Sequence, residues 1–295
     1  MDQTNKNIID QHIHSRASDG FFSPSNLVVM MKELEVDGAL VDHDTVKGIR
    51  DALKKSREIQ HTILTGVELS TYNGKTIHIL GYVIDEEHID DLENELNESQ
   101  QKRTEKTKLM VQKAHDKGLW ENINFEDIEK ENEYSAYISR IHVATALFRG
   151  GYHSSVLESL DAVNREGLYE LPEFKSPANG IDMLKKYFKE ISLAHLTTLN
   201  MDDFEEERFV RELKENGLTA IEAISSKYND EQIIKYLNIA KKYELKITVG
   251  SDFHWEESTP KARIGIDLNA TLTNDILENI GMKKEEIYGL IVSSG

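Results

Sequence analysis

Short apolar runs that end in histidine or acidic residues recur along this chain, and they restrict its fold more than any other feature. The first run spans residues 8–14, IIDQHIH. Successive side chains of a strand point to opposite faces, so His12 and His14 lie on one face if this segment is a strand. Two neighbouring imidazoles can chelate a divalent transition metal, and Asp19, in the turn that follows, can add an oxygen ligand.

Helical and strand patterns alternate after this run. Ser23 and Pro24 are typical of a helix start, and Leu27 to Leu34 contain apolar residues at helical spacing. The next apolar run, 39–41, leads directly into residues 42–44, Asp-His-Asp. This order favours a parallel sheet, whose buried strands are continuously apolar and whose functional residues lie at the carboxyl ends.

Further expected strands have the same residue types within or after them. They are 62–67 before Glu68, 76–81 containing His78, 191–194 before His195, 220–224, and 246–251 before Asp252 and His254. The candidate metal ligands are His12, His14, Asp19, His43, Glu68, His78, His195, Asp252 and His254. Burying these groups together without a cation costs about 1–3 kcal/mol for each unpaired group. The series therefore predicts a site for divalent metal ions.

Composition excludes several classes of protein. The 295 residues include no cysteine, so disulfides, thiolate metal sites and a cysteinyl-phosphate intermediate are excluded. A net charge of -18 argues against binding of duplex DNA, but it permits a small phosphorylated substrate or a nucleic-acid end in a cationic pocket. Residues 1–6 have no apolar signal core, and no apolar run approaches the roughly 18 residues that span a bilayer, so we expect a cytoplasmic protein without membrane contact.

The middle of the chain differs from both ends. Residues 88–117 are rich in Glu, Lys, Gln and Asn, and helical patterns follow at 125–132, 136–148 and 155–164. Strand patterns resume only near Ile191. We therefore expect a discontinuous barrel domain, 1–88 and 181–295, with a helical insertion or cap domain, 89–180, over its open end.

The ligand motifs, taken in order, resemble those of a known family. They are His12-Ile13-His14, Ser18-Asp19-Gly20, Asp42-His43-Asp44, Gly66–Ser70, Ile77–Gly81, Ala194-His195 and Gly250–His254. The series is similar to the polymerase and histidinol phosphatase (PHP) family of metal-dependent phosphoesterases. The likeness covers nearly the whole chain and is strongest to the branch of 3′,5′-nucleotide bisphosphate phosphatases and 5′-end-directed exoribonucleases.

This resemblance implies an α/β fold, a distorted (β/α)7 PHP barrel with a helical insertion. It also implies that the nine candidate residues hold about three divalent ions, often manganese, with iron or zinc as alternatives. Two departures from the family pattern are Leu196, where proline usually follows the histidine, and Gln11, where an apolar residue usually precedes His12.

The predicted activity is hydrolysis of a phosphate monoester of a small nucleotide, foremost a 3′,5′-nucleotide bisphosphate, or trimming of an RNA 5′ end. A metal-bound hydroxide attacks phosphorus, and no side-chain nucleophile is needed. The alternatives are a phosphatase for another metabolite such as histidinol phosphate, and a non-catalytic regulatory PHP module.

Residues predicted to contact substrate lie outside the ligand set. They are Arg16, Ser70, Arg140 and His142. Arg16 lies between the first histidine pair and Asp19, while Arg140 and His142 belong to a stretch that resembles an Arg-Gly-His-x-Ala segment of this branch. A guanidinium can bind a second phosphate through two hydrogen bonds.

Overall fold

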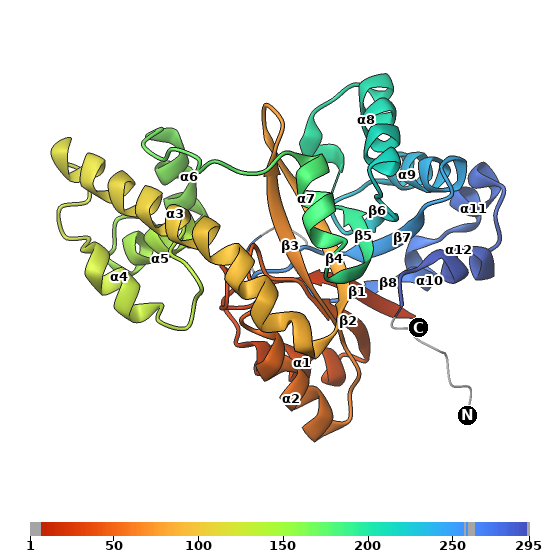
Figure 1. The fold of residues 1–295 in the computed structure, drawn as a ribbon, viewed down its shortest axis with the longest axis horizontal. Helices are drawn as coiled ribbons and strands as arrows, with labels where there is room; N and C mark the ends of the chain where they lie inside the picture. The colour runs from red at the N-terminus through yellow and green to blue at the C-terminus, as the bar shows by residue number, and fades with distance from the viewer. Residues whose placement is uncertain (1–6, 257, 259–262, 294–295) are drawn as a thin grey trace.

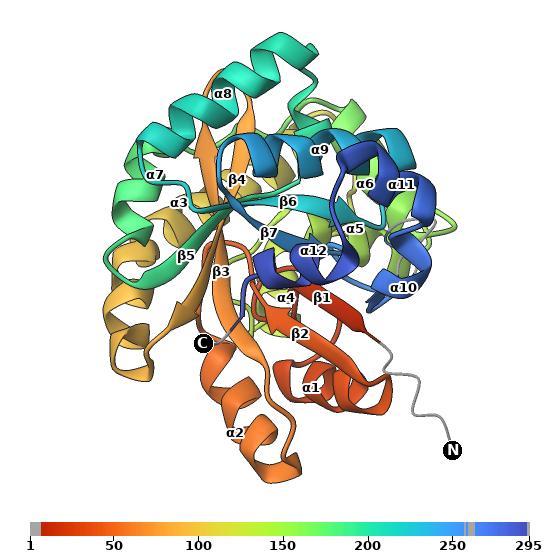
Figure 2. The ribbon, with the colours of Figure 1, turned by 90° about the vertical axis from the view of Figure 1, so that its right-hand side faces the viewer.

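The computed structural model describes residues 7–256, 258 and 263–293, and an eight-stranded sheet that curls into a barrel lies at its centre (Figure 1, Figure 2). The strands are β1 (Ile8–Ile13), β2 (Val36–Leu40), β3 (Leu64–Tyr72), β4 (Thr76–Ile84), β5 (Phe188–Leu193), β6 (Ala220–Ser225), β7 (Lys246–Gly250) and β8 (Ile266–Asp267). Their order across the sheet is β7-β6-β5-β4-β3-β2-β1-β8. The structure thus confirms the predicted α/β barrel class.

Helices cover the outside of this sheet and also form a separate lobe. They are α1 (Pro24–Glu33), α2 (Ile49–Ile59), η1 (Glu86–His88), α3 (Ile89–Asp116), α4 (Phe125–Glu131), α5 (Arg140–Arg149), α6 (Val156–Arg165), α7 (Pro177–Leu184), η2 (Leu196–Leu199), α8 (Asp203–Glu215), α9 (Asp230–Lys242), α10 (Leu268–Thr271), α11 (Asn274–Ile280) and α12 (Lys284–Leu290). Figure 2 shows α1, α2, α7, α8 and α9 around the strands.

β4 runs against both of its neighbours, and this reversal decides where His78 lies. β4 is antiparallel to both β3 and β5, whereas β1, β2 and β3 are mutually parallel, as are β5, β6 and β7. The beginning of β4 therefore lies at the same end of the barrel as the carboxyl ends of the other strands. His78 is opposite Ser70 in this hairpin. The strand expected to end before Glu68 continues to Tyr72, because β3 pairs with β4 from Gly66 to Tyr72.

The barrel closes at the first histidine pair. The His14 amide donates to the Phe253 carbonyl at 2.9 Å, and the Phe253 amide donates to the His12 carbonyl at 3.2 Å. Close approach of β1 and β7 requires Gly250, since a Cβ there would lie 2.4 Å from the His12 Cβ. The residues that close the barrel are therefore predicted metal ligands or lie next to them in the chain.

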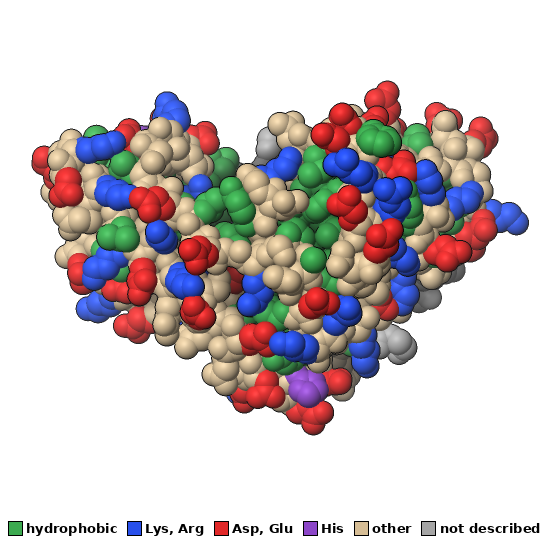
Figure 3. All heavy atoms as spheres, turned by 45° about the horizontal axis from the view of Figure 1, so that its top comes forward, with side chains coloured by type: hydrophobic (Ala, Val, Ile, Leu, Met, Phe, Trp, Pro, Cys, Tyr) green, Lys and Arg blue, Asp and Glu red, His purple; other side chains and the backbone are tan. Residues whose placement is uncertain are grey.

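The second lobe contains α3 to α6 (Figure 1) and has a hydrophobic core of its own. Met110, Val143 and Leu147 are fully buried in it. Trp255, from the segment after β7, packs into the same core and joins this lobe to the barrel. Figure 3 shows a notch in the outline between the two lobes. We call this lobe the cap.

The predicted boundary between residues 180 and 181 falls inside α7. This helix packs on β3, β4 and β5 of the barrel. The long helix expected from the polar composition of 88–117 is present as α3, with 28 residues.

Within the described residues, no helix is long and apolar enough to cross a membrane. Residues 1–6, in which no signal core was expected, lie outside the described residues. The cytoplasmic location stays a prediction.

Replacing Gly250 by Ala should destabilise the barrel. The added methyl would meet the His12 Cβ at 2.4 Å and Glu222 Oε2 at 2.8 Å. Overpacking of this kind costs about 1–3 kcal/mol, which denaturant unfolding can measure. The matched control is Gly289→Ala in α12, where no heavy atom lies within 4 Å of the new Cβ. Parental stability of Gly250→Ala would contradict the close approach of β1 and β7.

Candidate metal centre

A single buried carboxylate, Glu68 on β3, lies at the centre of the predicted ligands. Its side chain has no exposed surface. Oε2 lies 3.0, 3.1 and 3.0 Å from ring nitrogens of His12, His14 and His43, and Oε1 lies 3.0 and 2.9 Å from those of His78 and His195. Because both oxygens face imidazoles from different parts of the barrel, Glu68 could offer an oxygen ligand on each side of its carboxylate.

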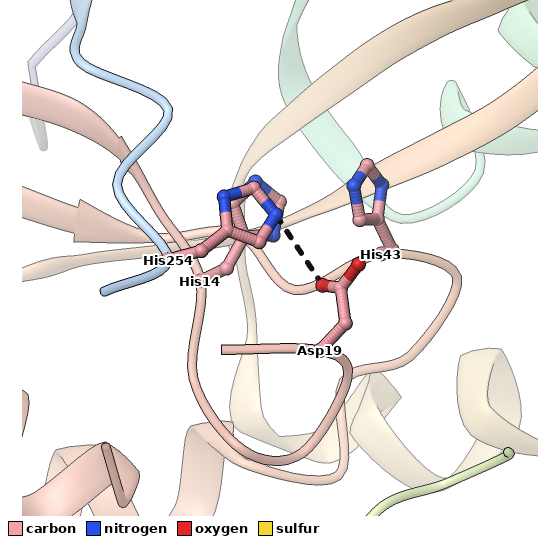
Figure 4. Close-up of side chains that lie close together, drawn as sticks. All are labelled: His14, Asp19, His43 and His254. Atoms are coloured by element: carbon pink, nitrogen blue, oxygen red, sulfur yellow. Dashed lines mark ion pairs between the residues drawn. The ribbon is translucent and has the colours of Figure 1, made fainter. Parts of the chain in front are cut away.

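A second group lies beside it at the loop after β1. His14, Asp19, His43 and His254 each offer one ligand atom, and these atoms all lie within 4.8 Å of one another (Figure 4). Asp19 Oδ1 is 3.4 Å from His254 Nε2.

A third group contains His12, His14, Glu68 and Asp252 within the same limit. Asp252 Oδ1 is 3.1 Å from His14 Nε2. Since His78 and His195 both contact Glu68, the structure brings all nine predicted ligand residues to one end of the barrel.

The short approaches in this cluster are mostly not hydrogen bonds. Among the described residues, the buried atoms without a hydrogen-bond partner include His12 Nε2, both ring nitrogens of His14, Asp19 Oδ1, His43 Nδ1, both oxygens of Glu68 and Asp252 Oδ1. Buried polar atoms are rarely left unpaired in folded proteins. Imidazole nitrogens and carboxylate oxygens are the ligands that Zn²⁺, Mn²⁺ and Fe²⁺ accept, so the donor set fits divalent metal ions.

The acidic ligands are held in their ionised form. Burial is the largest single influence on the pKa of Glu68 and raises it, but the neighbouring imidazoles, His43 and His12 foremost, together place that pKa well below its usual range. Burial likewise raises the pKa of Asp252, and Lys227, whose Nζ is 2.5 Å from Asp252 Oδ2, together with the imidazoles around it lowers that pKa well below its usual range. Both carboxylates are therefore available to a cation.

Glu222, which the sequence analysis did not single out, orients one ligand. Its Oε2 lies 2.7 Å from His12 Nδ1, and the residue has no exposed surface. A carboxylate on Nδ1 leaves Nε2 of His12 to face Glu68 and fixes the ring orientation. An acid in the middle of the apolar strand β6 was the available signal, because an unpaired buried carboxylate is costly.

Asp42 holds the loop that contains Asp19. Its Oδ1 accepts hydrogen bonds from the Ser15 amide and the Ser18 hydroxyl, each at 2.7 Å. Its Oδ2 accepts one from the Ser15 hydroxyl, also at 2.7 Å. The ligand Asp19 is thus placed by a short, fully hydrogen-bonded turn.

A cavity of about 290 Å³ lies between the metal centre and the cap. Asp19, His43, His78, Asp252 and His254 line one side of it. Three cationic side chains line it as well, Arg103 of α3, Arg140 of α5 and Lys227 after β6. The remaining wall is largely aromatic and aliphatic and includes Ile141, Leu157, Leu160, Tyr169, Leu171, Phe174 and Trp255. The cavity, which we call the cap cavity, suits a small anionic compound with an apolar part.

The predicted substrate residues are distributed unevenly around it. Arg140 lies on its wall, with its guanidinium 5.0 Å from the centre of the Tyr169 ring. Ser70 does not line the cap cavity itself, but its hydroxyl accepts a hydrogen bond at 2.6 Å from Arg103, which does.

Arg16 and His142 do not line the cap cavity. They line a smaller cavity of about 210 Å³, which we call the second cavity. Nδ1 of His142 accepts a hydrogen bond from the Ser139 amide at 3.0 Å, so this ring caps the start of α5.

Arg103 is the cationic residue that the sequence analysis missed. Its guanidinium contacts Asp44 and Ser70 and lies 4.9 Å and 5.0 Å from the ring centres of Tyr137 and Phe174. Its position in a long solvated helix had no distinguishing pattern, because the face of α3 that meets the barrel is set by tertiary packing.

The two departures from the family pattern have structural explanations. The Leu196 amide donates to the Tyr228 hydroxyl at 3.0 Å, a bond that a proline, which lacks an N–H, cannot make. Gln11 is buried, and its side chain bonds the Val292 carbonyl at 2.6 Å and the Val249 amide at 3.1 Å. It therefore fastens the C-terminal segment to the barrel interior.

Comparison with known proteins gives a consistent picture, although no protein-family model matches the chain. The chain is 27% identical over 273 residues to a 5′-3′ exoribonuclease of Haemophilus influenzae, covering 91% of this chain and 96% of that protein. It is 26% identical over 254 residues to a 3′,5′-nucleoside bisphosphate phosphatase of Chromobacterium violaceum, covering 83% and 87%. The crystal structure of an inferred metal-dependent phosphoesterase from Bifidobacterium adolescentis matches with a TM-score of 0.76 and 26% identity, covering 92% and 96%.

These relatives are hydrolases that act on phosphoester bonds. The predicted resemblance, including the branch of the family, is confirmed by them.

Changing Glu222 to Gln should weaken metal binding without unfolding the protein. Loss of a carboxylate that orients a ligating histidine typically reduces metal affinity by about 10- to 100-fold. Isothermal titration calorimetry, with Mn²⁺ added to chelator-treated protein, measures this affinity. Glu206→Gln is the matched control, because Glu206 is also buried but pairs with Lys235 away from the ligands.

The parent should bind Mn²⁺ and gain thermal stability from it. Failure of the parent to bind any divalent ion would contradict the metal centre itself.

Proposed function

We propose, from the premise that this chain is a metal-dependent phosphoesterase of the PHP type, that it hydrolyses the phosphate monoester of a 3′,5′-nucleoside bisphosphate. The observation that supports this most is the cap cavity, which has metal-ligand candidates on one side and three cations and an aromatic wall around the rest. A substrate with two phosphates and a base matches each of these surfaces.

The nine clustered residues would hold the metal ions, and we propose about three ions, with manganese first among the candidates. When bound, such ions activate water and stabilise the charge that develops at phosphorus. Glu68 lies between the imidazoles from both halves of the site, and Glu222 keeps the His12 ring in place. The protein's own part is to fix these groups before substrate arrives.

The cations of the cap would hold the second phosphate. Arg140 reaches the cavity from α5 and Arg103 from α3, and guanidinium groups bind phosphate through paired hydrogen bonds. Nε of Arg103 is buried and has no partner among the described residues. A phosphate oxygen at this place would pair an N–H that is otherwise unsatisfied.

The aromatic and aliphatic wall would receive the base. Tyr169 and Phe174 each have one cation near the ring, Arg140 and Arg103 respectively. A nucleobase can stack on such surfaces while its phosphates contact the adjacent guanidinium groups. The same cavity would admit the 5′-terminal nucleotide of an RNA, the substrate type named for the Haemophilus influenzae relative.

The alternatives fit less well. Histidinol phosphate has an ammonium group, and the carboxylates that line the cap cavity, Asp19 and Asp252, both belong to the ligand cluster. Arg103, Arg140 and Lys227 would repel that ammonium group. A non-catalytic module does not require the full ligand cluster that is present here.

A substrate panel with Mn²⁺ tests the proposal. Adenosine 3′,5′-bisphosphate should be hydrolysed faster than adenosine monophosphates, histidinol phosphate and a small aryl phosphate, and a chelator should abolish every activity. Asp252→Asn should remove turnover by several orders of magnitude. Turnover that survives chelation, or a preference for histidinol phosphate, would overturn the proposal.

Arg140→Ala should reduce kcat/KM for the bisphosphate by about 10- to 100-fold, since a lost charged hydrogen bond costs about 1.5–3 kcal/mol. Turnover of the aryl phosphate, which has no second phosphate, should change by less than about threefold. Arg165→Ala, at the far end of α6, is the matched control. Equal losses on both substrates would mean that Arg140 supports the fold of the cap rather than the second phosphate.

A further inference from the structure

A second opening reaches the metal centre from the other side of Asp19. The second cavity shares Asp19 and Ile141 with the cap cavity, and Arg16, Phe21 and His142 also line it. Asp19, a metal-ligand candidate, thus lies on the walls of two cavities. The proposed function accounts for only one of them.

Phe21 forms an aromatic surface at this opening. Its ring is stacked on Trp255, with 4.6 Å between ring centres and 12° between planes. It is nevertheless 42% exposed. Its backbone amide donates to the His254 carbonyl at 3.0 Å, so the ring is fixed to a ligand-bearing segment. One ring face is supported, and a large part of the side chain remains open to solvent.

Cations without carboxylate partners lie on the same surface. Arg16 makes no ion pair or side-chain hydrogen bond within the described part of the chain, and its guanidinium lies 5.4 Å from the Tyr134 ring centre. Nζ of Lys47 lies 5.6 Å from the centre of that ring, and its hydrogen bonds to residues that the structure describes go to the backbone carbonyls of Glu133 and Ser135. In a chain of net charge -18, two cations beside the half-buried Tyr134 ring, with the exposed Phe21 ring on the same cavity as Arg16, are unusual. This combination is typical of surfaces that bind single-stranded nucleic acids.

Three acidic groups nearby already have partners or belong to the ligand cluster. Glu131, in the second cavity, pairs with Arg149 at 2.7 Å. Asp19 belongs to the ligand cluster. Asp51 accepts a hydrogen bond from the Tyr134 hydroxyl.

The chemistry of the two candidate substrates explains why a second opening is needed. In both, water adds a hydroxyl to phosphorus, one bond from phosphorus to a nucleoside oxygen breaks, and that oxygen takes a proton. The scissile phosphate of a bisphosphate has no further substituent, whereas in RNA it is also linked to the following nucleotide. With the first nucleoside in the cap cavity, that following chain must leave by another path.

We propose that the surface formed by Phe21, Arg16, Tyr134 and Lys47 binds the single-stranded RNA that follows the scissile phosphate. Phe21 stacks on the first base beyond the cut, and Arg16 contacts the next phosphate. This inference rests on the proposed function, because it assumes that the first nucleotide occupies the cap cavity. It adds the residues that would distinguish an RNA substrate from a free bisphosphate.

The test compares a 5′-phosphorylated penta-adenylate with adenosine 3′,5′-bisphosphate, both with Mn²⁺. Phe21→Ala should raise KM for the oligonucleotide by about tenfold, as expected for loss of one base stack. Phe21→Leu should behave alike while keeping an apolar contact on Trp255, and Phe21→Trp should retain parental KM. The kcat/KM for the bisphosphate should stay within about twofold, since that substrate has no following base. Phe204→Ala on α8, which removes a 75% exposed ring elsewhere, is the matched control.

Each contrary result has a definite meaning. An unchanged oligonucleotide KM in both Phe21→Ala and Phe21→Leu, or equal losses on both substrates, overturns the inference. A parent that hydrolyses the bisphosphate but not the oligonucleotide overturns it and leaves the proposed function intact. A parent that hydrolyses neither overturns both.

Binding without catalysis gives a second measurement. Fluorescence anisotropy with a labelled penta-adenylate in EDTA should show weaker binding for Phe21→Leu. Arg16→Gln should reduce the slope of log affinity against log salt by about 0.7, the value for one phosphate contact on a single strand. An unchanged slope would remove Arg16 from the proposed path.

Discussion

The burial of the Glu68 carboxylate among five imidazoles is the constraint on which the rest of this structure depends. A charge removed from water is tolerated only if opposite charge or a metal ion compensates for it. The barrel supplies this compensation by bringing imidazoles from β1, β4 and the segments after β2 and β5 to Glu68 on β3. The reversed direction of β4 is part of the same arrangement, because it brings the first residues of that strand to the ligand end.

The cap complements this centre with the charges that the barrel lacks. The barrel contributes acids and imidazoles, while the cap contributes Arg103 and Arg140 and much of the aromatic wall. Arg103 also contacts Asp44, the residue after His43, and Ser70, two residues after Glu68. It therefore couples the cap to two ligand-bearing segments. Trp255 makes the corresponding link on the other side, since it follows His254 and packs into the cap core.

Much of this was predictable because local patterns and covalent order contain it. The apolar runs predicted strands near Ile8, Leu64, Thr76 and Lys246, and the structure confirms them. Prediction was weaker for boundaries, as with Glu68, which lies inside β3 rather than after it. It was weaker again for the substrate side, where Arg16 and His142 lie on a different cavity from Arg140.

By itself, the sequence determined where most strands lie along the chain, the class of fold and the kinds of side chain that could act as metal ligands, because strand alternation and residue chemistry are local properties. It also determined that any metal would be bound without thiolates. Only the tertiary structure decided that Glu222 orients His12, that Arg103 faces the cap cavity and that Phe21 stacks on Trp255 beside a second opening. In each case, the residues that meet lie far apart in the chain. Their contacts depend on barrel closure and on the face that each cap helix presents, and both follow from packing of the whole molecule rather than from any one segment.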